Sequence, residues 1–191
     1  MKETIERIGW APITSTEDGE YETGTLNWLT STVEGGREFK ATPEGSLKEI
    51  YADGKVVYSD IKNSGYAVDV TTIAALDDIR VGWYGEKKTA DGELLETDAD
   101  QIPNIVLCVV EKDVSAAKVS HILTVFYYCF AAEKLTHESK TSEGEFDPVF
   151  PAHKFKARPR LSDGYIKFEK TFDTLTEALV TSVPEPTDTS D

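Results

Sequence analysis

Three histidines are the side chains in this sequence best suited to acid–base catalysis or metal binding, and they lie far apart along the chain. His121 and His153 each lie in an apolar, strand-like run, which indicates a packing or surface role for both. His137 is followed by Glu138, and such a pair could contribute to a metal site. A structural metal needs three or four ligands at a characteristic spacing, and this pair has no third ligand beside it.

Motifs for nucleophilic catalysis and phosphate binding are absent from the sequence. No serine lies in the Gly-x-Ser-x-Gly turn of a hydrolase, and Gly35-Gly36 is not followed by the Lys-Ser or Lys-Thr of a phosphate loop. The acidic pair Asp77-Asp78 is best explained by a helix start, and Asp98 and Asp100 lack the glycine and the distal glutamate of a calcium loop. The sequence therefore predicts no enzyme activity, no cofactor and no metal.

The charge of the chain restricts the partners it can have. The 191 residues include 35 acidic and 20 basic ones, which gives a net charge of −15. Nucleic-acid binding depends on neutralising phosphates with lysine and arginine, so the sequence disfavours a DNA- or RNA-binding role and also docking on anionic membranes. No run of 18 apolar residues is present, and Met1-Lys2-Glu3-Thr4 does not resemble a secretory signal. We therefore expect no membrane anchor.

Short apolar runs alternate with turn residues along most of the chain, a pattern typical of β structure. We predict strands at 8–13, 46–50, 55–61, 66–72, 105–110, 119–132, 149–158 and 165–171. The runs at 105–110 and 119–132 are the most apolar and should form a central antiparallel pair, each with a buried free thiol, Cys108 and Cys129. Asp-Gly turns at 53–54, 91–92 and 163–164 predict hairpins, because glycine tolerates the positive φ of tight turns.

One helix is predicted after the strand that ends at Thr72, and two segments are predicted to lie outside the core. Four apolar residues recur at helical spacing: Ile73, Leu76, Ile79 and Trp83. Thr71 or Thr72 could cap this helix, and Gly85 helps to end it. Residues 133–148 are polar and should form a long exposed loop. Residues 172–191 contain no lysine or arginine, which predicts an acidic, disordered tail behind a single domain at 1–171, at least from Val183 onward.

The order of these signals resembles the major tail protein family of siphophages that infect Gram-positive bacteria. The resemblance begins at Gly9-Trp10-Ala11-Pro12-Ile13 and continues with Ile50-Tyr51-Ala52-Asp53-Gly54-Lys55-Val56-Val57-Tyr58. It also includes Asn63-Ser64-Gly65-Tyr66-Ala67-Val68-Asp69-Val70, a helix ending near Trp83-Tyr84-Gly85, and Asp91-Gly92-Glu93-Leu94-Leu95-Glu96. Each motif alone is a common turn or strand signature, but together they cover roughly residues 8–171 in the order typical of the family.

The resemblance implies a mainly β fold, namely a β-sandwich or partly closed barrel of antiparallel strands with one flanking α-helix. It also implies a structural virion protein, made in the host cytoplasm, that polymerises as hexameric rings stacked into the phage tail tube. The implied partners are other copies of the chain, a tape measure protein, a tail-tip initiator, and genomic DNA that passes without specific binding. An acidic channel wall would repel DNA and let it slide, so we expect several Asp and Glu residues to face the channel.

Within the long loop, five residues are candidates for contact between subunits: Glu133, Lys134, Leu135, Glu143 and Phe146. Leu135 and Phe146 would act as apolar anchors on an adjacent subunit, whereas a simple floppy hairpin loop is the alternative. Exposed strand edges would also allow neighbouring subunits to continue the sheet.

Two other functions fit a β-rich chain without catalytic residues. A β-sandwich binding module or virion decoration protein, which would bind carbohydrate or a host surface, would expose aromatic residues on one face, with Tyr21, Trp28 and Tyr58 as candidates. A barrel-type ligand carrier would need a sizeable apolar cavity. Self-assembly would separate a tube protein from a binding module, because the module stays discrete at high concentration.

Overall fold

The computed structural model describes residues 2–15, 21–30, 32–53, 55–115, 118–141 and 148–186. Nine strands form one antiparallel sheet in the order β2-β1-β8-β9-β10-β5-β4, with β3 paired to β1 and β11 paired to β9. These strands are β1 (Lys2–Ser15), β2 (Tyr21–Thr23), β3 (Asn27–Trp28), β4 (Gly36–Ala52), β5 (Lys55–Thr72), β8 (Ile105–Ser115), β9 (Lys118–Ala131), β10 (Ala152–Ala157) and β11 (Lys167–Phe172). A separate hairpin pairs β6 (Lys87–Lys88) with β7 (Leu94–Leu95), as the Asp-Gly turn at 91–92 predicts.

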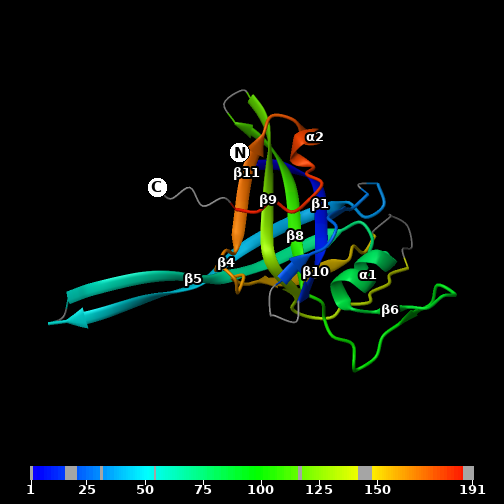
Figure 1. Ribbon diagram of the computed structural model, residues 1–191, viewed down its shortest axis with the longest axis horizontal. Helices are drawn as coiled ribbons and strands as arrows, with labels where there is room; N and C mark the ends of the chain where they lie inside the picture. Colours follow the sequence, from blue (N-terminus) through cyan, green and yellow to red (C-terminus); the bar gives the residue numbers. More distant parts are fainter. Residues whose placement is uncertain are drawn as a thin grey trace.

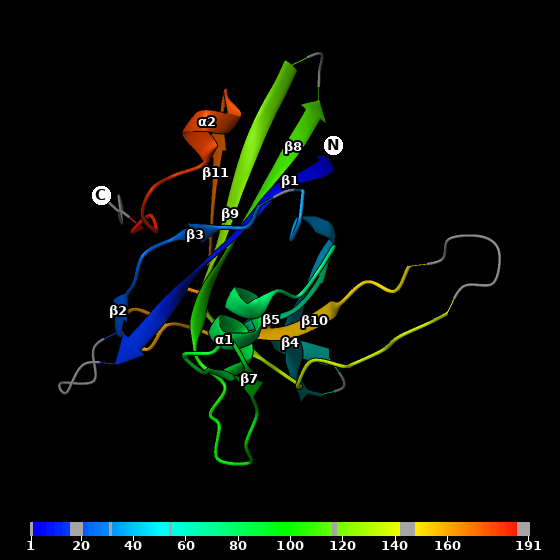
Figure 2. The same cartoon turned by 90° about the vertical axis from the view of Figure 1, so that its right-hand side faces the viewer.

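The sheet bends into two layers that face each other, as in a sandwich (Figures 1 and 2). One layer contains β1, β8, β9 and β11, and the other contains β10, β5 and β4. β9 belongs to both, because it pairs with β8 and β11 and, at residues 129–131, with β10. The strand order ends at β2 and β4, so the sheet does not close into a barrel. The prediction of a mainly β, antiparallel fold with a flanking helix is confirmed.

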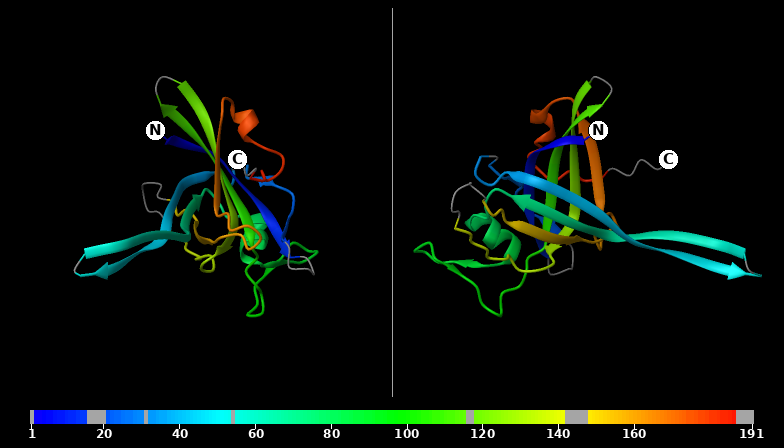
Figure 3. Two further views of the ribbon diagram at one scale, coloured as in Figure 1. Left: turned by 60° about the vertical axis from the view of Figure 1, so that its left-hand side comes forward. Right: turned by 180° about the vertical axis from the view of Figure 1, so that it is seen from behind.

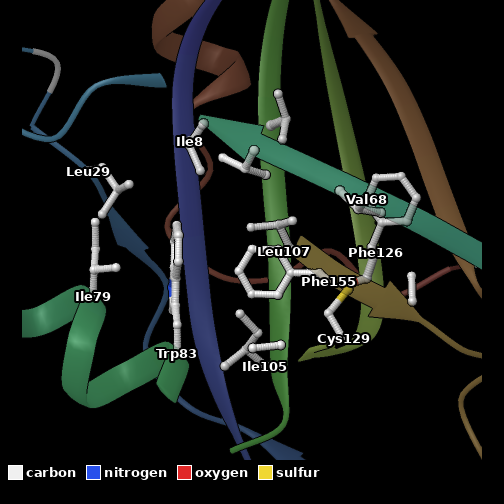
Figure 4. Close-up of a cluster of buried hydrophobic side chains, with 14 of the residues drawn as sticks. Ile8, Leu29, Val68, Ile79, Trp83, Ile105, Leu107, Phe126, Cys129 and Phe155 are labelled. Atoms are coloured by element: carbon white, nitrogen blue, oxygen red, sulfur yellow. The ribbon is translucent and has the colours of Figure 1, made fainter. Parts of the chain in front are cut away.

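The main core lies between the two layers and helix α1 (Asp77–Tyr84) (Figure 4). Its large buried side chains come from both layers and from the helix, and they include Ile8, Val68, Ile105, Leu107, Phe126, Phe155, Ile79, Trp83 and Tyr84. Trp83 meets Phe155 edge-on, with 5.1 Å between the ring centroids. Aromatic pairs in this geometry add to the stabilisation from area burial, so Trp83 fixes α1 on the sandwich.

Helix α1 begins later than the sequence pattern predicts. Thr72 does not cap it, because Thr72 belongs to β5 and its hydroxyl donates to the carbonyl oxygen of Ala74 at 2.9 Å. Leu76 takes the N-cap position without a side-chain hydrogen bond, and both Ile73 and Leu76 are exposed. The chain needs residues 73–76 to leave the sheet before it can turn into a helix. The predicted end is confirmed, since Gly85 follows the helix with the left-handed φ of 74°.

Both faces of the β8–β9 pair are buried, and this pair is the central one that the sequence predicts. Alternate residues of β8 point into two different clusters, with Leu107 in the main core and Cys108 in a second one. We call the second one the outer cluster, and its buried members are Ala11, Leu26, Val106, Cys108, Val110, Leu123, Val125, Tyr127 and Ala178. An antiparallel sheet often leaves one face to water, so the continuous apolar run at 105–110 reflects cover on both sides.

The C-terminal segment covers the outer cluster, and residues 172–186 therefore differ from the predicted disordered tail. Phe172 completes β11, and the short helix α2 (Leu175–Ala178) follows. Val180 O accepts a hydrogen bond from Trp28 Nε1 at 2.9 Å, and Pro184 O accepts one from Tyr127 Oη at 2.8 Å. The acidic composition misled the prediction, because apolar burial and these two bonds give the segment its order. Residues 187–191 lie outside the described part of the chain.

The strands on either side of the turn at 161–163 do not form the predicted hairpin with each other. β10 and β11 pair instead with separate sections of β9, at residues 129–131 and 121–126. The turn itself is present, since Gly164 N donates to Arg160 O at 2.7 Å. β9 is long enough to offer each short strand its own section, which a local turn signal does not reveal. No helix in the described ranges is long and apolar enough to cross a membrane.

Candidate assembly surface

A two-stranded arm projects from the body of the molecule (Figures 1 and 3). It consists of residues 45–64 at the adjoining ends of β4 and β5, and the pair Ala52–Lys55 at its tip confirms the hairpin predicted at Asp53-Gly54. β10 pairs with β5 only as far as Tyr66, so beyond that point the two arm strands pair with each other alone. The predicted separate strands at 55–61 and 66–72 are one strand, because Asn63-Ser64-Gly65 forms an irregularity in the ladder and not a turn.

Three large side chains of the arm are more than half exposed. The exposed fractions are 55% for Leu47, 62% for Tyr51 and 55% for Tyr58. Leu47 and Tyr51 lie on one face of β4, because residues an even number apart point the same way. A lone two-stranded hairpin is only marginally stable in water, so an arm with these side chains is typical of a segment that packs on another molecule.

Glu44 lies at the base of the arm between two basic side chains. Its Oε2 accepts a hydrogen bond from Arg158 Nη1 at 2.7 Å, and its Oε1 pairs with Lys156 Nζ. The hydrogen bonds from Lys156 and Arg158 hold the pKa of the Glu44 carboxyl below its ordinary value. Glu44 is therefore ionised at neutral pH and connects β4, one residue before the arm begins, to β10.

Among the described strands, β4 and β11 each have one edge without a sheet partner, as do the short strands β2 and β3. β4 pairs only with β5, and β11 pairs only with β9. Arg37, Glu38 and Lys40 on β4 are charged and exposed, and Pro43 lies in the same strand. Charge and proline at an edge limit unspecific pairing, while the free backbone groups still allow a matching strand to continue the sheet.

The first residues of the long loop contact their own subunit. Glu133 Oε1 pairs with Lys154 Nζ at 2.8 Å, and Lys134 Nζ pairs with Glu96 Oε1 at 3.2 Å. Leu135 is partly buried and packs against the main core of its own chain, and its role as an anchor on a neighbour stays a prediction. Residues 136–141 are exposed and lead away from the body (Figure 2). Glu143 and Phe146 lie outside the described residues, and a subunit contact through this loop stays a prediction.

Two hollows flank α1. The helix lies on the side of the molecule away from the arm (Figure 1). One, of about 740 Å³, lies between α1 and the long loop, and its lining includes the charged residues Arg80, Glu96 and Lys154. The other, of about 690 Å³, lies between α1 and β3 and is lined by Trp10 and Trp28, among others. Neither is the closed apolar cavity that a ligand carrier needs.

The aromatic residues proposed for a binding face do not come together. Tyr58 lies on the arm, whereas Tyr21 and Trp28 lie on β2 and β3, which both pair with β1. Trp28 donates its Nε1–H to the C-terminal segment, and Tyr21 packs edge-on against Tyr128 with 5.5 Å between the ring centroids. Packing within the chain therefore accounts for Tyr21 and Trp28, and only Tyr58 of the three aromatic side chains is exposed on the arm.

His153 lies in a buried hydrogen-bond network, which confirms its predicted packing role. Its Nε2 is 2.9 Å from Thr72 Oγ1, and its Nδ1 is 2.7 Å from Tyr84 Oη. The Thr72 hydroxyl already donates to Ala74 O, so it must accept from the Nε2–H of His153. Nδ1 then accepts from the Tyr84 hydroxyl. The neutral ring satisfies both bonds, and burial lowers the pKa of His153 to about 4.

The other candidate catalytic or metal-binding residues either make structural contacts or lie far from one another. His121 Nδ1 is 2.5 Å from Glu6 Oε2, and His137 is exposed. Cys108 and Cys129 are buried free thiols, as predicted, and burial raises the pKa of Cys108 to about 12. Within the described ranges, no three His, Cys, Asp or Glu residues come together as a metal site.

Sequence reasoning missed Glu44, Gly65 and Arg158 at the base of the arm. No local pattern announces this contact, because Glu44 and Arg158 lie 114 residues apart in the sequence. A scan against protein-family models finds no match, and a search of curated proteins finds no significantly similar sequence. The resemblance to major tail proteins therefore rests on the sequence motifs alone.

Proposed function

We propose that this chain is a tail tube subunit, a structural virion protein that polymerises as stacked hexameric rings around a channel for DNA. The arm is the observation that carries this proposal. It projects from the body with Leu47, Tyr51 and Tyr58 exposed, and its described residues pair only with each other. Burying such side chains against a second copy is favourable by about 25 cal/mol per Å² of apolar area. The order of the tail-protein motifs along residues 8–171 supports the same function.

The position of the arm suits head-to-tail assembly. The arm and the α1 end lie at opposite ends of the longest axis of the molecule (Figure 1). Contacts between unlike surfaces generate rings when the rotation closes and filaments when it does not. In a stack of equally oriented copies, the arm of one copy points toward the α1 end of the next. The free edges of β4 and β11 offer a second, lateral contact for neighbours within a ring.

Charge supports the passage of DNA without binding, although one face of the sandwich is mixed in sign. The net charge of −15 disfavours retention of DNA through phosphate contacts. On the β4–β5–β10 layer, however, Asp69 pairs across the sheet with Lys40 on one side and Lys154 on the other. A channel lined by this row would have a mixed wall, so the expected acidic wall requires other residues.

Negative-stain electron microscopy of the concentrated protein, alone and with tail-tip components of the same phage, tests the proposal. We expect rings or tubes with a channel wide enough for duplex DNA. A control variant replaces residues 46–62 by Asn-Gly, which joins the paired residues Gly45 and Asn63 by a two-residue turn. It should fold but form no tubes. Discrete particles of the parent protein under both conditions would contradict the proposal and favour a binding module.

A further inference from the structure

The arm leaves the body at a break in the β4–β5 ladder. Glu44 pairs with Gly65 and Gly45 pairs with Asn63, so Ser64 is the extra residue of a β-bulge. A bulge bends its strand and interrupts the ladder hydrogen bonds. Backbone pairing therefore holds the arm less firmly at this point than along the rest of the hairpin.

Local hydrogen bonds connect the residues around the bulge, but they do not connect the arm to β10. Ser64 Oγ donates to Glu44 O at 2.6 Å, and Gly65 N donates to Asn63 Oδ1 at 3.0 Å. Each of these bonds joins atoms of β4 and β5 only. A separate contact is needed to fix the hairpin relative to β10.

The Glu44 carboxylate makes such a contact at the last residue of β4 before the arm, in the pair with Gly65 that borders the break. Arg158 Nη1 donates to it at 2.7 Å, and Lys156 Nζ pairs with its other oxygen. Lys156 lies on β10, on the far side of β5 from Glu44, so the ion group crosses a whole strand. The side chains of Glu44, Lys156 and Arg158 are 29%, 32% and 37% exposed, so water screens their attraction only in part.

Gly65 makes room for the Arg158 side chain. Its φ of +145° lies outside the range that other residues readily adopt. A Cβ at this position would lie 2.1 Å from Ala157 O and 2.8 Å from Arg158 Nη1. The Arg158 guanidinium therefore lies against the β5 backbone at Gly65, where no side chain blocks it, and reaches Glu44. The ion group depends on glycine at this position.

We propose that Glu44, Lys156 and Arg158 form an ionic clamp that fixes the direction in which the arm projects. The importance of this clamp for assembly rests on the proposed function, because a stack requires each arm to meet the next copy at one angle. An arm that is held in place before docking loses less conformational freedom on assembly. The clamp therefore acts as a positioning group for the contact between copies.

Pulsed electron paramagnetic resonance on the full chain tests the clamp without requiring assembly. Nitroxide labels are placed at Lys55→Cys near the arm tip and at Thr171→Cys on β11, and the two native cysteines are buried. The unaltered clamp should give one narrow distance distribution. Glu44→Gln keeps the size of the side chain and removes its charge, and it should at least double the width. Glu38→Gln, exposed on the same strand, should leave the width unchanged.

A second variant and an independent assembly measurement separate the possible failures. Arg158→Gln should broaden the distribution as Glu44→Gln does, and circular dichroism checks that both variants fold. An unchanged width in both folded variants, or equal broadening in Glu38→Gln, would overturn the clamp. If the parent protein forms no tubes while both clamp variants broaden, the proposed function fails and the clamp stands. In tubes of the parent protein, the clamp predicts slower growth for Glu44→Gln than for Glu38→Gln.

Discussion

At the scale of single residues, His153 shows how burial turns a reactive side chain into a structural one. Its two ring nitrogens join β10 to Thr72 at the end of β5 and to Tyr84 at the end of α1. Trp83 packs edge-on against the ring, with 4.9 Å between the centroids. A proton on Nδ1 would remove the acceptor for the Tyr84 hydroxyl, so the fold stabilises the neutral ring.

The stability of the protein should depend on pH through His153. The pKa of its side chain falls from 6.5 to about 4 on folding, so the unfolded chain binds the proton more readily between these values. Stability is complete above pH 6.5 and falls as the pH drops toward 4, by about 3 kcal/mol in total. Urea unfolding at pH 7 and pH 5 should show a smaller loss for His153→Gln than for the parent protein. The exposed His137→Gln serves as control, and an equal loss in all three proteins would contradict the prediction.

Gly65 should tolerate a side chain less well than a glycine in an open turn. Gly65→Ala meets both the positive φ and the backbone oxygen of Ala157. Gly92→Ala meets only a positive φ of 85°, with nothing within 4 Å of its Cβ. We expect Gly92→Ala to cost about 1 kcal/mol and Gly65→Ala to cost clearly more, as measured by thermal unfolding. Equal costs would show that the space beside Gly65 is not restrictive.

At the scale of elements, the C-terminal segment acts as the cover of the β8–β9 pair. Leu175, Leu179, Val180 and Val183 pack on the outer cluster, and Trp28 and Tyr127 bond to its carbonyl oxygens. Removing it would expose side chains of β8 and β9 that are otherwise buried on both faces. The segment is therefore part of the domain and not an appendage to it.

Truncation should reveal where the domain ends. A chain that ends at Phe172 should lose a few kcal/mol of stability, because it loses four partly buried Leu and Val side chains and uncovers the outer cluster, and a fully buried Leu or Val contributes about 1.5–3 kcal/mol. A chain that ends at Pro186 keeps every contact described for the segment and should match the parent protein. Urea midpoints measure both differences. Equal midpoints for the parent and the Phe172 truncation would show that the segment adds no stability.

At the scale of the whole molecule, the two ends of the longest axis have different characters. The arm presents exposed aromatic and aliphatic side chains at one end, and the opposite end carries the two hollows beside α1 (Figure 1). Such polarity suits a protein that repeats one contact between unlike surfaces. A symmetric dimer would instead use one self-complementary patch.

Changing the arm surface should affect assembly and leave the fold intact. We expect the triple variant Leu47→Ser, Tyr51→Ser, Tyr58→Ser to keep the thermal midpoint of the body within a few degrees, because none of these side chains is buried. Its tube formation, followed by light scattering and electron microscopy, should be lost or need at least tenfold more protein. Val33→Ser, Leu161→Ser and Leu95→Ser, which are exposed elsewhere, form the matched control. Equal loss in both triple variants would show that the effect is not specific to the arm.

The sequence by itself determined features that depend on neighbouring residues. The Asp53-Gly54 and Asp91-Gly92 turns, the end of α1 at Gly85 and the central pair of apolar strands all follow from local backbone preference and hydrophobic patterning. The structure adds that both faces of β8 are covered, because its alternate residues enter two different clusters. Apolar residues between Leu175 and Val183 cover the outer face of β8 and β9. The acidic composition of the tail predicted disorder for this segment, so its packing was not foreseen.

Only the tertiary structure decided which distant segments meet. β10 and β11 share β9 and do not pair with each other, and Asn63-Ser64-Gly65 forms a bulge and not a turn. Glu44 and Arg158, which form the base of the arm, lie 114 residues apart. Local propensity carries no information about such contacts, because their energy arises only when the folded layers bring the side chains within hydrogen-bonding distance. The direction of the arm is therefore a property of the fold as a whole.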